Sequence, residues 1–273
     1  MYTLNSGNNV KILVDTHAHL HMNQFDTDRD DVLKRASTLE LVINVSTSLS
    51  DIDDTIKIAN LCDNTFAAIG IHPHDSKDVG NDYLDIIQKK IDIQKRGKRI
   101  IAIGEIGLDY FRNMSPIDTQ KKVFAEQLML AQENDLPVIL HIRDAYEDAY
   151  DILKTVGIPE KRGIVHSFSS DENWAKKFVK LGFKLGIGGP ITYPKNDLLR
   201  SVVKIVGVEN IVTETDCPYL PPQQYRGKRN EPIYVSYVVD TLNVIFECDI
   251  STIVFENALQ LFGLTKIGGA GLR

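Results

Sequence analysis

Cysteine is scarce in this sequence, and long hydrophobic runs are missing. The three cysteines, Cys62, Cys217 and Cys248, are unevenly spaced and form no CxxC pair. This argues against a disulfide framework and favours a reduced compartment. No apolar stretch approaches the roughly 18 residues that a membrane-spanning helix needs. Residues 1–9 are polar and lack the layout of a signal peptide, so we expect a cytoplasmic protein.

Several common motifs are also absent. The chain has no GxxxxGK[ST] or GxGxxG phosphate loop and no GxSxG nucleophile elbow, so nucleotide cofactors and serine hydrolysis are unsupported. The formal net charge of -6 and the pI of about 5.7 argue against a surface that binds nucleic acid everywhere. A local basic patch beside an active site remains compatible with this charge.

Eight short apolar runs alternate with amphipathic segments along the chain. The runs are residues 11–15, 41–46, 66–71, 100–105, 138–141, 163–166, 183–187 and 211–216. The expected helices include residues 51–62, 83–95, 118–134, 146–156, 174–181, 232–246 and 251–262. Buried parallel strands that alternate with helices, eight times over, are typical of a TIM barrel. We predict a single α/β domain, a (β/α)8 barrel over residues 11–264, with an open doubly wound sheet as the alternative. Residues 1–10 are expected to form an N-terminal extension and residues 265–273 a flexible tail.

Histidines and carboxylates end five of the eight predicted strands. In chain order they are His17, His19, Glu105, His141, His166 and Asp216. The carboxyl ends of barrel strands form the face that holds active sites. So many buried polar groups are costly unless a cation unites them, and the number of ligands predicts two divalent ions. The assignment is His17, His19 and Asp216 for the first ion, His141 and His166 for the second, and Glu105 as the bridge.

A bridged pair of divalent ions carries more positive charge than its two carboxylates neutralise. Such a centre suits an anionic substrate, and it favours phosphodiester hydrolysis. Asp216 is the candidate general base, and Glu214, on the same side of the strand, would assist it or hold a ligand in place. An amide or ester hydrolase, such as one acting on aminoacyl-tRNA, could use the same ions. A non-catalytic protein stabilised by metal is the third hypothesis.

Seven motifs together resemble the TatD family of metal-dependent hydrolases. They are DTHAH at 15–19, GIHPH at 70–74, GEIGLDY at 104–110, PVILHIR at 137–143, HSF at 166–168, TETDCPYL at 213–220 and RGKRNEP at 226–232. The resemblance implies a divalent-metal deoxyribonuclease, and some members are 3′ to 5′ exonucleases. It implies one metal position made by His17, His19, Glu105 and Asp216. It implies a second position made by Glu105, His141 and His166.

Several basic residues lie where a substrate would approach this face. Arg226, Lys228 and Arg229 follow the eighth strand closely and are interpreted as contacts to a nucleic-acid backbone, with a solvated charge run as the alternative. Arg143 lies two residues after a ligand and is expected to bind phosphate, unless it forms a surface salt bridge. His74 ends the third strand and would orient a phosphate or a water molecule. The partner implied is DNA, single-stranded or at its 3′ ends, bound by a monomer.

Three further residues near the predicted site have other interpretations. His21 extends the first motif to HxHxH, and we expect a solvent-facing loop residue rather than a ligand. His72 is expected to support a ligand or the turn that contains Pro73. Cys217, next to Asp216, is expected to be buried packing rather than a nucleophile.

The identity of the two ions is not predicted, because the types of ligand residue do not distinguish Mg²⁺, Mn²⁺ and Zn²⁺.

Overall fold

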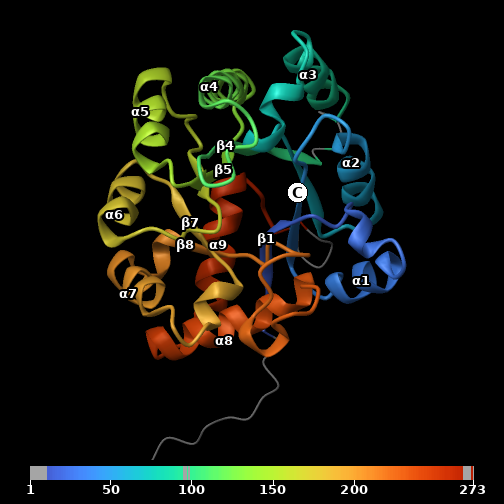
Figure 1. The fold of residues 1–273 in the computed structure, drawn as a ribbon. Helices are drawn as coiled ribbons and strands as arrows, with labels where there is room; N and C mark the ends of the chain where they lie inside the picture. The colour runs from blue at the N-terminus through green and yellow to red at the C-terminus, as the bar shows by residue number, and fades with distance from the viewer. Residues whose placement is uncertain (1–10, 95–96, 98, 267–271, 273) are drawn as a thin grey trace, which may run out of the picture.

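The computed structural model of the chain describes residues 11–94, 97, 99–266 and 272, and its centre is a ring of eight parallel strands (Figure 1). The strands are β1 (Val14–Ala18), β2 (Leu41–Val45), β3 (Thr65–Ile69), β4 (Ile100–Asp109), β5 (Val138–Arg143), β6 (Gly163–Val165), β7 (Lys184–Ile187) and β8 (Ile211–Thr213). Each strand pairs in parallel with the next one in the sequence. The predicted barrel is confirmed.

The ring closes where β1 meets β8. A parallel bridge joins Ala18 to Cys217, and the backbone N–H of His19 donates to the Cys217 carbonyl at 2.8 Å. Threonine side chains complete the seam, because Thr16 Oγ1 donates to the Thr213 carbonyl and Thr213 Oγ1 donates to the Val14 carbonyl. An open sheet would leave these two strands apart, so the doubly wound alternative is excluded.

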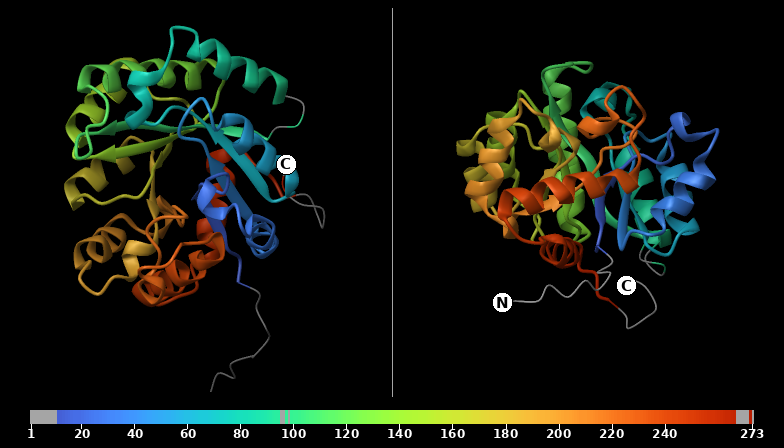
Figure 2. Two further views of the ribbon diagram at one scale, coloured as in Figure 1. Left: turned by 45° about the vertical axis from the view of Figure 1, so that its right-hand side comes forward. Right: turned by 90° about the horizontal axis from the view of Figure 1, so that it is seen from below.

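Helices cover the outside of the ring (Figure 2). They are α1 (Arg29–Ala36), α2 (Ile52–Leu61), α3 (Tyr83–Gln94), α4 (Ile117–Glu133), α5 (Tyr146–Val156), α6 (Glu172–Lys180), α7 (Asp197–Val206) and α8 (Val235–Phe246), while α9 (Ser251–Phe262) lies at one end of the barrel. None of these helices, within the described residues, has the length and apolar character needed to cross a bilayer.

Helix α9 closes the amino-terminal end of the barrel (Figure 2). Its Phe255 and Phe262 pack against inward-facing strand residues such as Ile43 and Val212. Asn257 anchors the helix, because its side-chain amide donates to the Ile211 carbonyl at the start of β8. With this end plugged by apolar side chains, the carboxyl ends of the strands form the open face of the barrel.

The strand boundaries differ from the predicted ones mainly at β1, β4 and β8. Strand β1 begins three residues later than the apolar run does, so His17 lies within it. Strand β4 continues four residues beyond Glu105, to Asp109, with an irregularity in its pairing with β5 between Ile103 and Ile106. Strand β8 ends at Thr213, which places Asp216 in the loop that follows. The predicted N-terminal extension and most of the predicted tail lie outside the described residues.

Candidate metal centre

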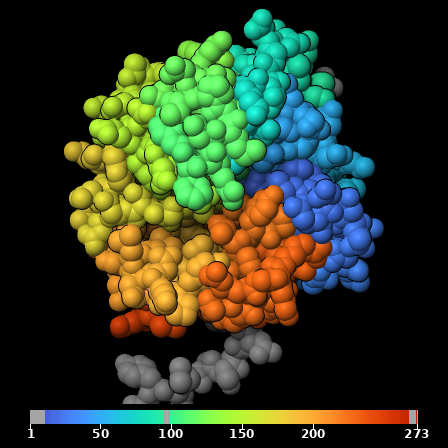
Figure 3. All heavy atoms as spheres, viewed as in Figure 1, coloured from blue at the N-terminus to red at the C-terminus, as the bar shows by residue number. Residues whose placement is uncertain are grey.

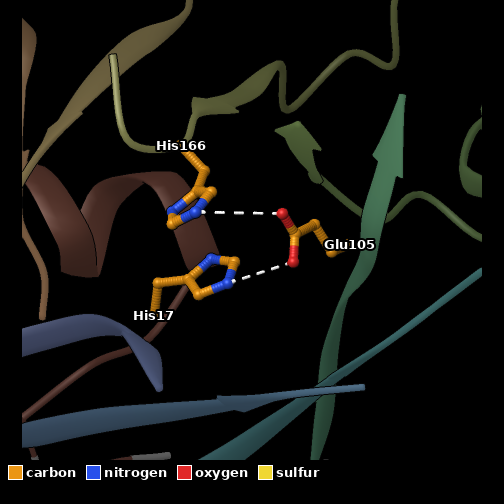
Figure 4. Close-up of side chains that lie close together, drawn as sticks. All are labelled: His17, Glu105 and His166. Atoms are coloured by element: carbon orange, nitrogen blue, oxygen red, sulfur yellow. Dashed lines mark ion pairs between the residues drawn. The ribbon is translucent and has the colours of Figure 1, made fainter. Parts of the chain in front are cut away.

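Glu105 is the common neighbour of the histidines on the open face. Its Oε2 atom lies 3.3 Å from His17 Nε2, and its Oε1 atom lies 2.8 Å from His141 Nδ1 and 3.8 Å from His166 Nε2. Figure 4 shows the two oxygens turned toward different imidazoles. The carboxylate is almost fully buried, with 4% of its side chain exposed. Glu105 is therefore placed to bridge two sets of ligands.

The first set of ligand atoms comes from both sides of the barrel seam. His17 Nε2 and His19 Nε2 lie 3.1 Å apart, and Asp216 Oδ1 lies 3.4 Å from His19 Nε2. Two atoms bound to one ion at about 2.1 Å are roughly 3.0 to 3.5 Å apart at octahedral or tetrahedral angles. The observed spacings therefore fit a divalent cation. The seam supports this arrangement, because the N–H of Asp216 donates to the His17 carbonyl at 2.8 Å.

His19 and His166 each have a partner on the side of the ring away from the centre, and this partner determines which ring nitrogen faces the centre. His19 Nδ1 lies 2.7 Å from the Val45 carbonyl, so Nδ1 carries the proton and Nε2 is left as an electron-pair donor. His166 Nδ1 makes an ion-pair contact with Glu214 Oε1 at 2.9 Å, which leaves Nε2 on the inward side. Glu214 is fully buried and also accepts the N–H of Ser167 at 2.6 Å. The structure thus places Glu214 behind His166, where it can position a ligand.

His141 is held between two carboxylates, one of which the sequence analysis did not assign. Its Nε2 lies 3.1 Å from Asp109 Oδ2, and its Nδ1 faces Glu105. Asp109 also lies 2.9 Å from His74 Nε2 and accepts the N–H of Arg112 at 2.7 Å. Asp109 is buried and occupies the last position of β4. With Nε2–H donated to Asp109, Nδ1 of His141 is the atom available to a metal ion.

Charge and burial set the protonation of the central groups. Burial opposes ionisation of Glu105, but the nearby His72 and His17 outweigh it and hold its pKa well below the usual range. Burial, reinforced by His166, lowers the pKa of His17, so this imidazole is neutral at physiological pH. Burial also opposes ionisation of Asp216, yet the histidines around it lower its pKa. His17, Glu105 and Asp216 thus have the forms that bind divalent cations. At His19 and His141 burial also opposes protonation, but the carboxylates beside them outweigh it and raise both pKa values, so an incoming cation competes with protons there.

Sequence comparison decides the family to which this centre belongs. The family model described as TatD related DNase matches residues 14–263. The chain belongs to the TatD family. It is 40% identical over 256 residues to YabD of Bacillus subtilis, an uncharacterized metal-dependent hydrolase, covering 92% of this chain and 99% of that protein. It is 32% identical over 258 residues to a protein of Rahnella named 3′-5′ ssDNA/RNA exonuclease TatD, covering 90% of this chain and 97% of that protein.

Structural comparison agrees with this result. The crystal structure of YjjV, a TatD homolog from Escherichia coli K12, matches with a TM-score of 0.86 at 30% identity, covering 94% of this chain and 100% of that one. The TatD family resemblance carried by the seven motifs is therefore confirmed. The chain is a metal-dependent hydrolase of the TatD family, and its clustered histidines and carboxylates form three overlapping groups able to hold a metal ion.

Replacing Asp109 with asparagine is expected to lower metal affinity or hydrolytic activity by about 10 to 100-fold, the usual cost of losing a partner of a metal-binding histidine. The amide keeps the size of the side chain but removes the charge that fixes the proton on His141 Nε2. Isothermal titration with Mn²⁺ or Zn²⁺ and the rate of hydrolysis measure the effect. Asp144→Asn, an exposed position one residue after β5, serves as the control. Wild-type affinity and rate in the Asp109 variant would contradict this role.

Metal affinity in this TatD-family centre is expected to increase with pH up to about 10. Burial lowers the pKa of His166, but Glu214 and Asp216 outweigh it and raise this pKa to about 10. Below that pH a cation must displace the proton from Nε2, so each displaced proton changes the affinity by up to about tenfold per pH unit. Titrations in buffers of different ionisation enthalpy would count the protons released. Glu214→Gln should release fewer protons, and equal release from both proteins would contradict the assignment.

His72 faces the same centre with its Nε2 atom, too far from Glu105 for a hydrogen bond. Its Nδ1 accepts the N–H of His74 at 3.1 Å, and its Nε2 lies 3.7 Å from Glu105 Oε1. Burial, reinforced by His141, lowers the pKa of His72 far enough to keep the ring neutral. A neutral ring that accepts at Nδ1 carries its proton on Nε2. The geometry therefore favours the supporting role over a ligand role, although His72 is close enough to Glu105 and His141 to complete a metal-binding group.

His21 lies in a loop as expected, but the expectation that it faces solvent was wrong. Only 4% of its side chain is exposed, and its Nε2 atom lies 3.4 Å from Asp51 Oδ2. Its Nδ1 pairs with the Thr55 hydroxyl at 3.2 Å. The ring thus contacts the loop before α2, where Asp51 also accepts the N–H groups of Thr47 and Ser48. The interpretation of Cys217 as buried packing is confirmed, since it is fully buried in the apolar core.

The predicted substrate-binding cations occupy different environments. Arg143 is exposed at the mouth, with its guanidinium carbon 4.0 Å from the ring centroid of Phe111. Arg226 and Lys228 are also exposed, and the described residues give none of these three an ion pair. Arg229 instead forms a two-pronged ion pair with Asp28 at 2.6 and 2.7 Å. A second pair to Glu231 and stacking over Phe25 engage it further, so Arg229 joins the loop after β8 to α1.

Proposed function

We propose that this TatD-family protein hydrolyses phosphodiester bonds of DNA and removes nucleotides from a 3′ end. The observation that carries the proposal is Glu105, whose two oxygens face two separate sets of histidine nitrogens. A carboxylate shared in this way suits a pair of divalent ions about 3.5 to 4 Å apart, the arrangement used in many phosphoryl transfers. The centre would be reached through the open, carboxyl-terminal face of the barrel.

We assign residues to the two ions as the family resemblance implies, with Glu105 shared between them, although the closest groups of donor atoms join His166 to His17 and His141 to His72. The first ion would be held by His17, His19, Glu105 and Asp216. The second would be held by Glu105, His141 and His166. When bound, Mg²⁺, Mn²⁺ or Zn²⁺ ions would polarise the phosphoryl group and lower the pKa of a water molecule. The protein contributes the fixed ligand orientation, through Val45, Asp109 and Glu214.

The chain itself supplies a proton acceptor beside these ligands. Asp216 Oδ1 lies 3.4 Å from His19 Nε2 and 3.8 Å from His166 Nε2, and 15% of its side chain is exposed to the open face. Its lowered pKa keeps it ionised, so it can take the proton of an attacking water. Glu214 is fully buried, and we assign it to the orientation of His166. His74, paired with Asp109, would fix the carboxylate that holds His141.

The charges around the mouth favour an anionic polymer. Two divalent ions would exceed the charge of Glu105 and Asp216, the two carboxylates assigned to contact them directly, and so could attract a phosphate. Arg143 and the exposed Arg226 and Lys228 add cations around the same face. The name of the Rahnella relative, a ssDNA/RNA exonuclease, supports a nucleic-acid substrate for this chain as well.

The test is cleavage of a 3′-labelled single-stranded DNA oligonucleotide in the presence of Mg²⁺, Mn²⁺ or Zn²⁺. Early release of labelled mononucleotide is expected for a 3′ to 5′ exonuclease, whereas labelled fragments of many lengths would indicate an endonuclease. RNA of the same sequence and an aminoacyl-tRNA are assayed in parallel. Release of the amino acid without any cleavage of DNA would overturn the proposal and favour an ester hydrolase with the same metal centre.

A further inference from the structure

A groove of about 400 Å³ lies between the loop after β7 and the loop after β8. It is lined by Tyr193, Pro194, Lys195, Asn196, Gln223 and Arg226. Two hydrogen bonds tie its walls together. The Tyr193 hydroxyl donates to the Pro221 carbonyl at 2.9 Å, and the N–H of Gln223 donates to Thr192 Oγ1 at 2.8 Å. The groove is therefore preformed by contacts between the two loops rather than created by a ligand.

The groove carries positive charge that nearby carboxylates do not neutralise. Lys195 and Arg226 are exposed, and neither has an ion pair with any carboxylate among the described residues. Asp197, two positions after Lys195, pairs instead with Arg200 at 2.8 Å. The guanidinium carbon of Arg226 lies 4.5 Å from the ring centroid of Tyr193, so the aromatic ring supports the guanidinium from one side. On a chain of net charge -6, two unpaired cations beside an aromatic ring indicate an anionic ligand.

A smaller cavity of about 70 Å³ adjoins the groove. Asn196 lines both spaces. The smaller cavity is also lined by Ser167, which directly follows His166, and by Gly188, which directly follows β7. In Figure 3 the gold residues after β7 and the orange residues after β8 lie side by side on the viewed face. The groove, the smaller cavity and the metal centre therefore all lie at the carboxyl ends of β6, β7 and β8, so a polymer whose end lies at the ligands would cross this face toward Lys195 and Arg226.

Resting on the proposed nuclease activity, we propose that this groove binds the uncleaved part of a single-stranded nucleic acid, on the 5′ side of the scissile bond. Lys195 and Arg226 contact backbone phosphates. A base stacks on the outer face of the Arg226 guanidinium, which Tyr193 supports from behind; stacking of unpaired bases on arginine planes is common in single-strand recognition. The groove would set how tightly a long substrate binds without taking part in the cleavage step.

The test compares a Lys195→Ala/Arg226→Ala double variant with Lys204→Ala. Lys204 is exposed in the last turn of α7, which begins at the groove and runs away from this face, so its loss removes charge outside the path. Each protein is assayed on a 20-nucleotide single strand and on bis(4-nitrophenyl) phosphate. In the double variant, kcat/KM for the oligonucleotide divided by kcat/KM for bis(4-nitrophenyl) phosphate is expected to fall at least tenfold. The slope of log Kd for the oligonucleotide against log salt should fall by about 0.7 for each phosphate that the variant no longer neutralises.

An Arg226→Lys variant separates charge from stacking. It should keep the salt slope of the wild type but bind the oligonucleotide more weakly, because lysine supplies a point charge without the planar group on which a base can stack. If the wild type is active and the double variant has the same ratio, Kd and salt slope, the proposed role of the groove is overturned. The proposed function is then left intact. If the wild type cleaves neither substrate, the nuclease proposal fails. Fluorescence anisotropy then tests separately whether the groove binds the oligonucleotide. Equal Kd values for the wild type and the double variant would overturn this binding role.

Discussion

Replacing Glu105 with glutamine is expected to lower kcat/KM for an oligonucleotide on the order of 10³-fold or more. The Glu105 carboxylate, the proposed bridge, lies within 4 Å of nitrogens from His17, His141 and His166, and an amide would offer one neutral oxygen in place of two charged ones. Loss of metal binding removes several kcal/mol of transition-state stabilisation, and each 1.36 kcal/mol is a factor of ten in rate. Metal content by atomic emission and the cleavage rate at saturating metal measure the two effects.

The fold of the Glu105 variant must be checked separately from its activity. Glutamine has nearly the same shape, so the circular dichroism spectrum is expected to match that of the wild type. Glu133→Gln, at the exposed end of α4, makes the same chemical change away from the centre and should retain full activity. A Glu105 variant that keeps both its metals and its rate would remove the bridging role, and with it the main support for a two-ion centre.

The convergence of these histidines and carboxylates on one face could be predicted from the sequence because barrel geometry is regular. Parallel strands that follow each other around a ring bring their carboxyl ends to one face, so residues far apart in the sequence must meet there. The alternation of a strand puts His17 and His19 on one side. The structure brings these together with Glu105 and Asp216, as the pattern of polar strand ends indicated. The helix at 251–262 was predicted to its exact bounds because its apolar period and its flanking glycine are both local signals.

The contacts that position the ligands could not be predicted in the same way. Asp109 lies four residues past the expected end of β4, and its partners His74 and His141 are 35 and 32 residues away. Arg229 belongs to a basic run that suggested nucleic-acid binding, yet it pairs with Asp28, 201 residues earlier in the chain. Local sequence reports the charge of a segment but not which distant carboxylate neutralises it. Arg226, from the same basic run, stays exposed. Its proposed role in binding a single strand depends on Tyr193 and Lys195, which lie far from it in the sequence and beside it in the structure.

Replacing Asp216 with asparagine is expected to lower kcat on the order of 10² to 10⁴-fold, the usual contribution of a general base. Asp216 adopts a left-handed backbone conformation with φ of 57°, which asparagine also tolerates, so the loop and its bond to the His17 carbonyl should be kept. What is lost is the negative charge 3.4 Å from His19 Nε2 and the oxygen able to accept a proton. Rates are therefore compared at metal concentrations that give equal occupancy.

Asp135→Asn provides a matched control for the Asp216 variant. Asp135 has a φ of 51° and follows α4, on the side of the barrel away from the open face, where it pairs with Lys161 at 3.0 Å. This change makes the same substitution in the same backbone conformation and should leave kcat unchanged. If Asp216→Asn lowers only metal affinity, and kcat recovers at full occupancy, Asp216 is a ligand and the proton acceptor must be sought elsewhere. A kcat that stays low at full occupancy, with a normal KM, assigns proton transfer to Asp216 itself.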